Sequence, residues 1–472
     1  MVTRLGNQYA NILDGTDGRD ELYGFDNNDE LYGNGDDDFL KGGGGADYLH
    51  GGAGYDTADY SDSNAEVYIY LAPDGMTGHG YGGTAEGDRL VSIEDVSGSI
   101  HGDYLHGNGR GNVLLGEDGN DHLYGFAGDD ALYGGRGDDW LEGGQGRDFL
   151  VGGPGIDTAS YASSTDGVIV SLMPDPITGM GFGLLFAIYG GDGGGDTLYQ
   201  IENLVGSGGY DSLVGDDNAN IIDGLGGGDQ ITGYGGSDQL LGGEGRDRLD
   251  GQDGVGGNDL LVGGPGDDLY LLDLGDTLVE LPGGGRDGIF IPVDGYTLPA
   301  NFEDLWFEGV SSSIVRGAGN ASDNEIGGSE FANRLDGLAG NDTLHGFQGA
   351  DTLLGGEGRD TLEGGWANDQ FVWTLTTETG TTEATADVIL DFNVAEGDRI
   401  HLSAIDADIY ADGNQTFRFI GPGAFSGKPG EINYYHAGGN TYVQLQTGTS
   451  TDLEAVIRLD GILVPEASWF VL

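Results

Sequence analysis

Leucines recur at every ninth position along most of the chain, and each one stands two places after an aspartate or an asparagine. The apolar positions of one such run are Leu105, Leu114, Leu123, Leu132, Leu141 and Leu150. A fixed period of this kind is the signature of a repeat architecture. We therefore expect a solenoid in which each repeat contributes one inward apolar side chain.

The polar position of the repeat is aspartate in most cases. Four runs carry these aspartates, namely Asp20, Asp29, Asp38, Asp47 and Asp56, then Asp103, Asp121, Asp130, Asp139, Asp148 and Asp157, then Asp211, Asp229, Asp238, Asp247, Asp259 and Asp268, and finally Asp342, Asp351, Asp360 and Asp369. Asparagines hold the position near the openings of the runs, at Asn11, Asn112, Asn220, Asn324 and Asn333. We interpret the asparagines as weaker or capping sites.

The repeat reads G-G-x-G-x-D-x-Φ-x, as in GGRGDDWLE at residues 134–142 and GGQGRDFLV at residues 143–151. Glycines permit the positive φ angles of a tight turn, and the x-Φ-x triplet is long enough for a short strand with one inward side chain. Two such units would complete one coil. The predicted fold is all-β, a parallel β-roll or β-helix solenoid with wider β inserts and a C-terminal β cap.

Composition agrees with turns rather than helices, because the chain holds 98 glycines among 472 residues. Its net charge of −64 would repel nucleic acid and anionic membranes and attract cations. An acidic, glycine-rich chain could also be disordered, but the fixed phase of the leucines argues against that alternative. The absence of cysteine excludes disulfides and thiolate metal sites, and no apolar run is long enough for a transmembrane segment.

The aspartates and the turn carbonyls are hard oxygen donors in a flexible loop, which favours several calcium ions over zinc or magnesium. The alternative is that the aspartates only form Asx-Gly turns. Each nine-residue repeat buries only one leucine side chain. The free energy gained from that burial offsets little of the conformational entropy lost when nine backbone residues are ordered. A bound divalent cation would offset that cost and the repulsion between neighbouring carboxylates.

The consensus resembles the RTX (repeats-in-toxin) repeat of hemolysin-type calcium-binding proteins, which are secreted bacterial proteins. The resemblance implies that each ion lies between turns on the same edge of the roll, eighteen residues apart. Asp121 would then pair with Asp139, and Asp130 with Asp148. The aspartates of all four runs are the metal ligands that this resemblance implies.

Three stretches with fewer glycines separate the runs, and the first two resemble each other: DTADYSDSNAEVYIYL at 56–71 and DTASYASSTDGVIVSL at 157–172. The first stretch continues to the Ile-Glu pair at 93–94, and the second continues to the Ile-Glu pair at 201–202. Glu94 lies nine residues before Asp103, and Glu202 lies nine residues before Asp211. We interpret all three stretches as widened coils or side loops of the solenoid, with linkers between separate domains as the alternative.

The chain is accordingly divided into alternating segments. The four β-roll runs are 1–60, 101–160, 207–270 and 324–373, the three β inserts are 61–100, 161–206 and 271–323, and the C-terminal domain is 374–472.

From Ala386 onward the sequence resembles the C-terminal domain of serralysin-type metalloproteases, through Asp391-Phe392, Gly397-Asp398, Gly430-Glu431 and the apolar terminus SWFVL. In that family the domain caps the roll and carries an uncleaved type I secretion signal. The N-terminus lacks the apolar core of a signal peptide. The resemblance implies an extracellular protein exported by the type I machinery of a Gram-negative bacterium.

We expect no enzyme in this chain. None of the eight histidines begins an H-E-x-x-H motif, and no serine has the flanking glycines of G-x-S-x-G. His50, His106 and His122 flank inward leucines and are expected to face solvent. The predicted function is a non-enzymatic calcium-binding protein acting at the cell surface, in matrix or at a host interface. The alternative is an extracellular polysaccharide-modifying enzyme, or its repeat portion, with a site in the inserts.

Overall fold

The computed structural model describes residues 1–73, 75–173, 183–184, 195–252, 257–307, 314–449 and 453–472. These residues form strands and turns, and their helical elements are three short 3-10 turns, η1 (Gly83–Ala85), η2 (Thr376–Glu378) and η3 (Ala467–Trp469). None of these helices is long and apolar enough to cross a membrane. The chain divides into two compact units, one of Met1–Gly264 and Gly275–Val279, the other of Pro265–Leu274 and Glu280–Leu472.

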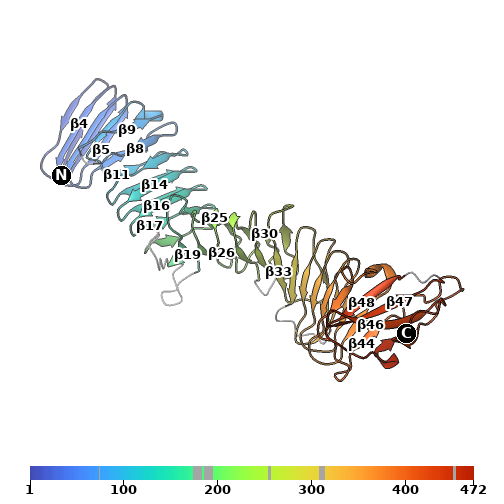
Figure 1. The fold of residues 1–472 in the computed structure, drawn as a ribbon. Coiled ribbons are helices and arrows are strands. Elements are labelled where there is room, and N and C mark those ends of the chain that lie inside the picture. Colours follow the sequence, from blue (N-terminus) through green and yellow to red (C-terminus); the bar gives the residue numbers. More distant parts are fainter. Residues whose placement is uncertain (74, 174–182, 185–194, 253–256, 308–313, 450–452) are drawn as a thin grey trace. The chain divides into compact units, whose positions relative to one another are not determined.

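Two long sheets form most of the first unit (Figure 1). The first contains, in spatial order, β1 (Val2–Leu5), β3 (Asp20–Asp26), β5 (Phe39–Gly44), β7 (Thr57–Asp59), β11 (Asp95–Ser97), β13 (Val113–Asp118), β15 (Ala131–Arg136), β17 (Phe149–Val151), β21 (Thr197–Tyr199) and β20 (Gly183–Leu184). The second contains β2 (Ile12–Asp14), β4 (Glu30–Gly35), β6 (Tyr48–Ala53), β10 (Arg89–Val91), β9 (Gly78–Tyr81), β8 (Tyr68–Tyr70), β12 (Tyr104–His106), β14 (His122–Ala127), β16 (Trp140–Gln145), β18 (Thr158–Ser160), β22 (Asn203–Val205), β24 (Ile221–Asp223), β27 (Gln239–Leu241), β30 (Leu260–Val262) and β32 (Thr277–Val279).

Smaller ladders complete the first unit. They are β19 (Ile169–Ser171), β23 (Ser212–Val214), β26 (Gln230–Thr232) and β29 (Arg248–Asp250), together with the short pair β25 (Gly226–Gly227) and β28 (Glu244–Gly245). Successive strands of each ladder come from alternate repeats, because two repeats complete one coil.

The register confirms the predicted parallel roll. Leu114 on β13 pairs with Leu132 on β15, and Leu123 on β14 pairs with Leu141 on β16, each eighteen residues apart. All four leucines have no exposed surface. In this run the strands from β13 to β16 are six residues long, not three, because the pairing continues into the turn. Phe126, in the left-handed region at φ 75°, still pairs with Gly144 at φ 92°.

The first insert departs from the coil through an antiparallel excursion. Strand β9 pairs antiparallel with both β8 and β10, whereas β10 is parallel to β6 and β8 is parallel to β12. The insert therefore adds strands within the second sheet and then returns to the parallel register. Much of the second insert, at 174–182 and 185–194, lies outside the described residues.

The second unit is built from two ladders. One contains β31 (Leu269–Leu271), β33 (Gly288–Ile291), β35 (Asp304–Phe307), β37 (Glu325–Gly327), β39 (Thr343–His345), β41 (Thr361–Glu363), β43 (Asp387–Ile389), β48 (Ala455–Leu459), β47 (Asn440–Gln446), β46 (Glu431–Ala437) and β45 (Arg418–Gly421). The other contains β34 (Tyr296–Thr297), β36 (Ile314–Ala318), β38 (Ala332–Asp336), β40 (Thr352–Leu354), β42 (Gln370–Val372), β44 (Arg399–His401) and β49 (Phe470–Val471).

The C-terminal strands extend the coils of this unit. Strands β43 and β44 add parallel strands to β41 and β42, and the terminal β49 pairs with β44. Strand β47 pairs antiparallel with both β46 and β48. Strand β46 is parallel to β45, and β48 joins the solenoid by pairing parallel with β43. The buried Trp373 donates its indole N–H to Asp387 Oδ2 at 2.8 Å.

Candidate metal centres

The aspartates of the four runs are buried at the edges of the coils. Every one of the predicted ligands from Asp20 to Asp369 has at most 2% of its surface exposed. We call the aspartate or asparagine position of each repeat a slot. Along an edge, the backbone N–H of one slot residue donates to Oδ1 of the aspartate one coil later. Asp121 N–H lies 2.9 Å from Asp139 Oδ1, and Asp139 N–H lies 2.8 Å from Asp157 Oδ1. The eighteen-residue pairs inferred from sequence are therefore neighbours in space.

The opposite edge carries its own row. Asn112 N–H donates to Asp130 Oδ1 at 2.7 Å, and Asp130 N–H donates to Asp148 Oδ1 at 2.8 Å. The second unit repeats this pattern, since Asp342 N–H donates to Asp360 Oδ1 at 2.9 Å. Each carboxylate thus uses one oxygen to join two coils.

The second carboxylate oxygen, Oδ2, is buried without a hydrogen-bond partner in many of these slots. Among the described residues this holds for Asp29, Asp38, Asp47, Asp56, Asp121, Asp130, Asp139, Asp148, Asp157, Asp229, Asp342, Asp351, Asp360 and Asp369. A buried, unpaired carboxylate oxygen is costly unless a cation or a proton compensates it. A row of such oxygens therefore fits a series of bound cations.

The first glycine of each repeat leaves room for the carboxylate and for a backbone oxygen. A methyl group on Gly116 would overlap the carboxylate of Asp121 and would also lie 2.5 Å from the carbonyl oxygen of Gly134, one coil further on. Carboxylate and carbonyl oxygens therefore gather at the same edge. This donor set is hard and all-oxygen, and it suits calcium. Calcium would supply the positive charge that holds neighbouring coils together.

Three of the predicted ligands are satisfied within their own turns. Thr16, Ser99 and Ser207 each donate a backbone N–H to Oδ2 of the aspartate four residues later, which is Asp20, Asp103 or Asp211. The hydroxyl groups of the same residues donate to these carboxylates as well. Because these hydrogen bonds already compensate the buried carboxylates, a cation would stabilise these three aspartates less than the slots whose Oδ2 is unpaired.

The asparagine slots are also closed by hydrogen bonds. Asn112 Oδ1 accepts the N–H of Asn108 at 2.7 Å, and its Nδ2 donates to the carbonyl of Glu94 at 2.7 Å. Asn220 makes the equivalent bonds to Asp216 and Glu202. An amide can donate where a carboxylate cannot, so these turns close without added charge.

Several carboxylates that the nine-residue period did not reveal continue the same rows. Asp47 N–H donates to Asp88 Oδ1 at 2.7 Å, and Asp148 N–H donates to Asp196 Oδ1 at 2.8 Å, although these pairs are 41 and 48 residues apart. The others are Asp276, Asp287, Glu303, Asp387 and Asp398. The aspartates among them stand two places before an apolar residue, as in Asp88-Arg-Leu, and that triplet is the signal in the sequence. Glu94 and Glu202, which the sequence places nine residues before Asp103 and Asp211, also accept the N–H of a slot aspartate.

Burial raises the pKa values of the run-two aspartates in the absence of metal. The pKa is about 8 for Asp121 and Asp148, about 7 for Asp157, and about 6 for Asp130 and Asp139. The hydrogen bond from the coil before opposes this rise, and nearby carboxylates add to it. Without calcium, the coil therefore holds protons that an unfolded chain would release.

Acid is expected to replace calcium in part. Because these pKa values lie above the ordinary aspartate value of 3.8, the metal-free coil binds more protons than the unfolded chain, so its stability falls as pH rises through about 6 to 8. In chelator, lowering the pH from about 8 to about 5 should increase β structure in circular dichroism. In calcium, the same change should raise the calcium concentration at half-folding, because protons compete for the carboxylates. A metal-free chain equally unfolded at both pH values would contradict this prediction.

Gly134→Ala is expected to raise the calcium concentration at half-folding, because its methyl group would overlap the Asp139 carboxylate. Overpacking of this kind costs about 1–3 kcal/mol. Gly109→Ala is the matched control, since nothing lies within 4 Å of its added Cβ and its φ is not positive. Calcium titrations followed by circular dichroism compare the two variants, and equal midpoints would contradict the steric argument.

Aromatic rings and histidines form rows on the second sheet. His106 stacks between Tyr70 at 4.4 Å and Tyr124 at 4.7 Å, and His122 stacks on Tyr104 at 4.6 Å. Both histidines are half-buried, and burial lowers their pKa values. The expectation that they face solvent freely is therefore wrong, because neighbouring coils bring equivalent outward side chains into contact.

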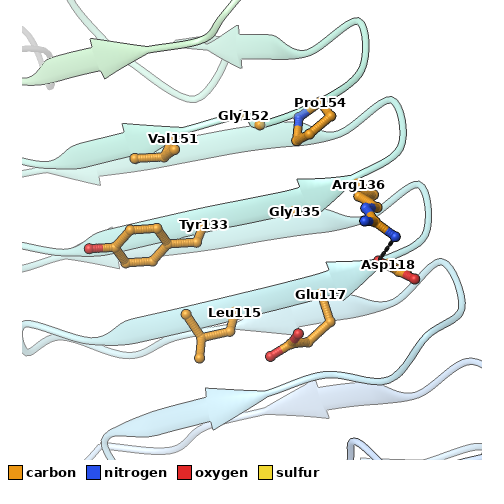
Figure 2. Close-up of a pocket in the computed structure, with 10 residues that line it drawn as sticks. Leu115, Glu117, Asp118, Tyr133, Gly135, Arg136, Val151, Gly152 and Pro154 are labelled. Atoms are coloured by element: carbon orange, nitrogen blue, oxygen red, sulfur yellow. Dashed lines mark ion pairs between the residues drawn. The ribbon is translucent and has the colours of Figure 1, made fainter.

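A shallow groove lies on the first sheet, across β13, β15 and β17 (Figure 2). It has a volume of about 420 Å³, and its floor includes Leu115, Tyr133 and Val151. Glu117 and Asp118 lie at one end, where Asp118 faces Arg136 at 3.9 Å. Both acids are open to solvent.

The parallel coils and their rows of buried carboxylates define a calcium-binding β-roll. The chain belongs to the RTX calcium-binding nonapeptide repeat family, whose repeat unit matches residues 5–40, 23–58, 106–141, 124–159, 200–231, 232–255, 253–279, 319–346, 327–362 and 345–372. Calcium is accordingly the metal of these repeats.

Among solved structures, the chain is similar to a repeat subunit of the mannuronan C5-epimerase from Azotobacter vinelandii. The identity is 26% over 32% of this chain and 78% of the other, with a TM-score of 0.24. The comparison with curated proteins gave no match.

Proposed function

We propose that this protein is a non-enzymatic RTX protein that is exported unfolded and folds when it binds calcium outside the cell. The observation that carries the proposal is the row of buried carboxylates whose Oδ2 atoms accept no hydrogen bond within the described residues, as at Asp130 and Asp148. Cytosolic calcium is too low to fill weak sites, whereas extracellular modules bind at about 10⁻⁴–10⁻³ M. The same chain would thus be expanded before export and compact after it.

The individual ligands follow from the same feature. Slots whose Oδ2 is unpaired, such as Asp121 and Asp139, are the calcium ligands of this proposal, and turn carbonyls complete the sites. Asp20, Asp103 and Asp211, which accept bonds from their own turns, would serve as the ends of rows. This arrangement refines the ligand set inferred from sequence.

Export through the type I machinery of a Gram-negative bacterium is part of the proposal. It rests on the resemblance of residues 374–472 to the serralysin-type C-terminal domain. The terminal β49 pairs with β44, and the buried Phe470 lies opposite Ile400. A signal in this domain would enter the exporter while low cytosolic calcium keeps the coils unfolded.

Removing about the last fifty residues, the span of such a signal, is expected to retain the protein inside the cell. The measurement compares protein in medium and in cell pellet, in a Gram-negative host that carries a type I exporter. As a control, residues 374–472 fused to a small passenger protein should reach the medium. Secretion of the truncated chain at the full-length level would place the signal elsewhere.

The surface offers a place for an extracellular partner such as a polysaccharide or a host surface. Stacked rings such as Tyr70 and His106 form an aromatic face, and the groove of Tyr133 lies on the other sheet. The alternative function, polysaccharide modification, is tested by incubating the calcium-loaded protein with polysaccharides. Saturable turnover would favour the alternative over a binding role.

A further inference from the structure

The connection between β31 and β33 departs from the nonapeptide rule but keeps the carboxylate row. Asp268 is followed by the next slot carboxylate of its edge, Asp287, after nineteen residues, and Asp268 N–H donates to Asp287 Oδ1 at 2.9 Å. The turn before Asp287 reads Pro-Gly-Gly-Gly-Arg-Asp, with Gly283 in the left-handed region at φ 77°. Asp268 and Asp287 both belong to the second unit.

A third carboxylate, from Glu280, joins this pair. One carboxylate oxygen from each of Asp268, Glu280 and Asp287 lies within 4.8 Å of the other two. Asp268 and Asp287 are 2% and 1% exposed, and Glu280 is half-buried. Within the described residues, Asp287 Oδ2 is buried without a hydrogen-bond partner. Asp287 therefore brings to the cluster an oxygen that is free to coordinate a cation.

Glu280 is held in place by two donors. The hydroxyl of Tyr270, a fully buried side chain, lies 2.7 Å from Glu280 Oε2, and the N–H of Leu281 lies 2.8 Å from Oε1. Tyr270 is in turn packed edge-on against Phe302 at 5.2 Å between ring centres. A flexible glutamate is thus oriented towards the two aspartates before any ion binds.

The arginine next to this cluster forms its ion pairs with other carboxylates. Arg286, which directly precedes Asp287, pairs with Asp304 and Glu325. Three carboxylates at this separation repel one another strongly when partly buried, and a divalent cation reverses the sign of that interaction. All three ligands are anionic oxygens, which favours calcium over zinc or copper.

We propose that Asp268, Glu280 and Asp287 bind one calcium ion, at a site that takes a glutamate side chain from the insert in addition to the aspartates of the row. The ion joins the turn before β31 to the turn before β33. It stabilises a connection that has no full nonapeptide repeat. The site adds to the calcium-dependent folding proposed above and is defined by residues of its own.

The test uses the full-length chain, with calcium as the probe. Glu280→Gln removes one charge and one ligand oxygen, and Glu330→Gln, at an exposed position of the same unit, is the matched control. Native mass spectrometry at saturating calcium should show one ion fewer for Glu280→Gln and the wild-type number for Glu330→Gln. Hydrogen exchange should show lower protection for residues 268–291 only.

Tyr270→Phe provides a second variant, because it keeps every ligand and removes the hydroxyl that orients Glu280. It should keep the wild-type ion number at saturating calcium and require more calcium to protect residues 268–291. An unchanged ion number in Glu280→Gln, with or without a change in protection, would overturn the site. Failure of the wild-type chain to fold on calcium would instead overturn the proposed function.

Discussion

Removal of calcium is expected to unfold the β-roll. At neutral pH in a chelator, the chain should lose most of its β signal and expand, and about millimolar calcium should restore a compact β-rich state. The reason is that, without calcium, the buried rows such as Asp121, Asp139 and Asp157 must either repel one another or take up protons, while each coil buries little apolar surface. Circular dichroism and small-angle scattering in chelator and in calcium measure the change.

Magnesium serves as the control for ionic strength and for non-specific charge screening. It prefers a smaller octahedral site and gives up its water reluctantly, so equal concentrations should fold the chain less. An identical β signal in chelator and in calcium would show that the carboxylate rows do not need a cation.

Asp139→Asn is expected to weaken calcium binding on one edge of the second run. Asparagine has nearly the same shape and can still accept the N–H of Asp121, but it replaces Oδ2 with an amide nitrogen that cannot bind a cation. The contacts that join Asp139 to Asp121 and Asp157 should therefore form only at higher calcium. Stability in a solenoid is close to a sum of neighbour terms, so the effect should be local.

Hydrogen exchange during a calcium titration resolves the effect by position. The midpoint should rise most for β14, β16 and β18, less for the opposite edge at Asp130 and Asp148, and little for Asp342 to Asp369 in the other unit. Asp138→Asn is the matched control, because it removes one charge from an exposed neighbour. His122→Ala would be a poorer control, since His122 stacks on Tyr104. Equal shifts for Asp138→Asn and Asp139→Asn would indicate a general charge effect.

The regular repeats could be read from the sequence because their geometry is local. A nine-residue unit with a turn and a short strand returns the chain to the same edge after eighteen residues, whatever the surroundings. The pairing of Leu114 with Leu132 and the all-β parallel roll follow from that period. The choice of calcium follows as well, since only hard oxygen donors recur in the turns.

The tertiary structure decided the features for which the period fails. Asp88 reaches Asp47 only because β9 turns back between β8 and β10, and no local rule sets the length of that excursion. The stacking of His106 on Tyr70, 36 residues apart, likewise depends on which coil follows the insert. Glu280 meets Asp268 and Asp287 only through an irregular connection held by Tyr270. Spacing along the chain determines contacts within a repeating coil, whereas contacts across an insert depend on how its strands pack, which the period does not encode.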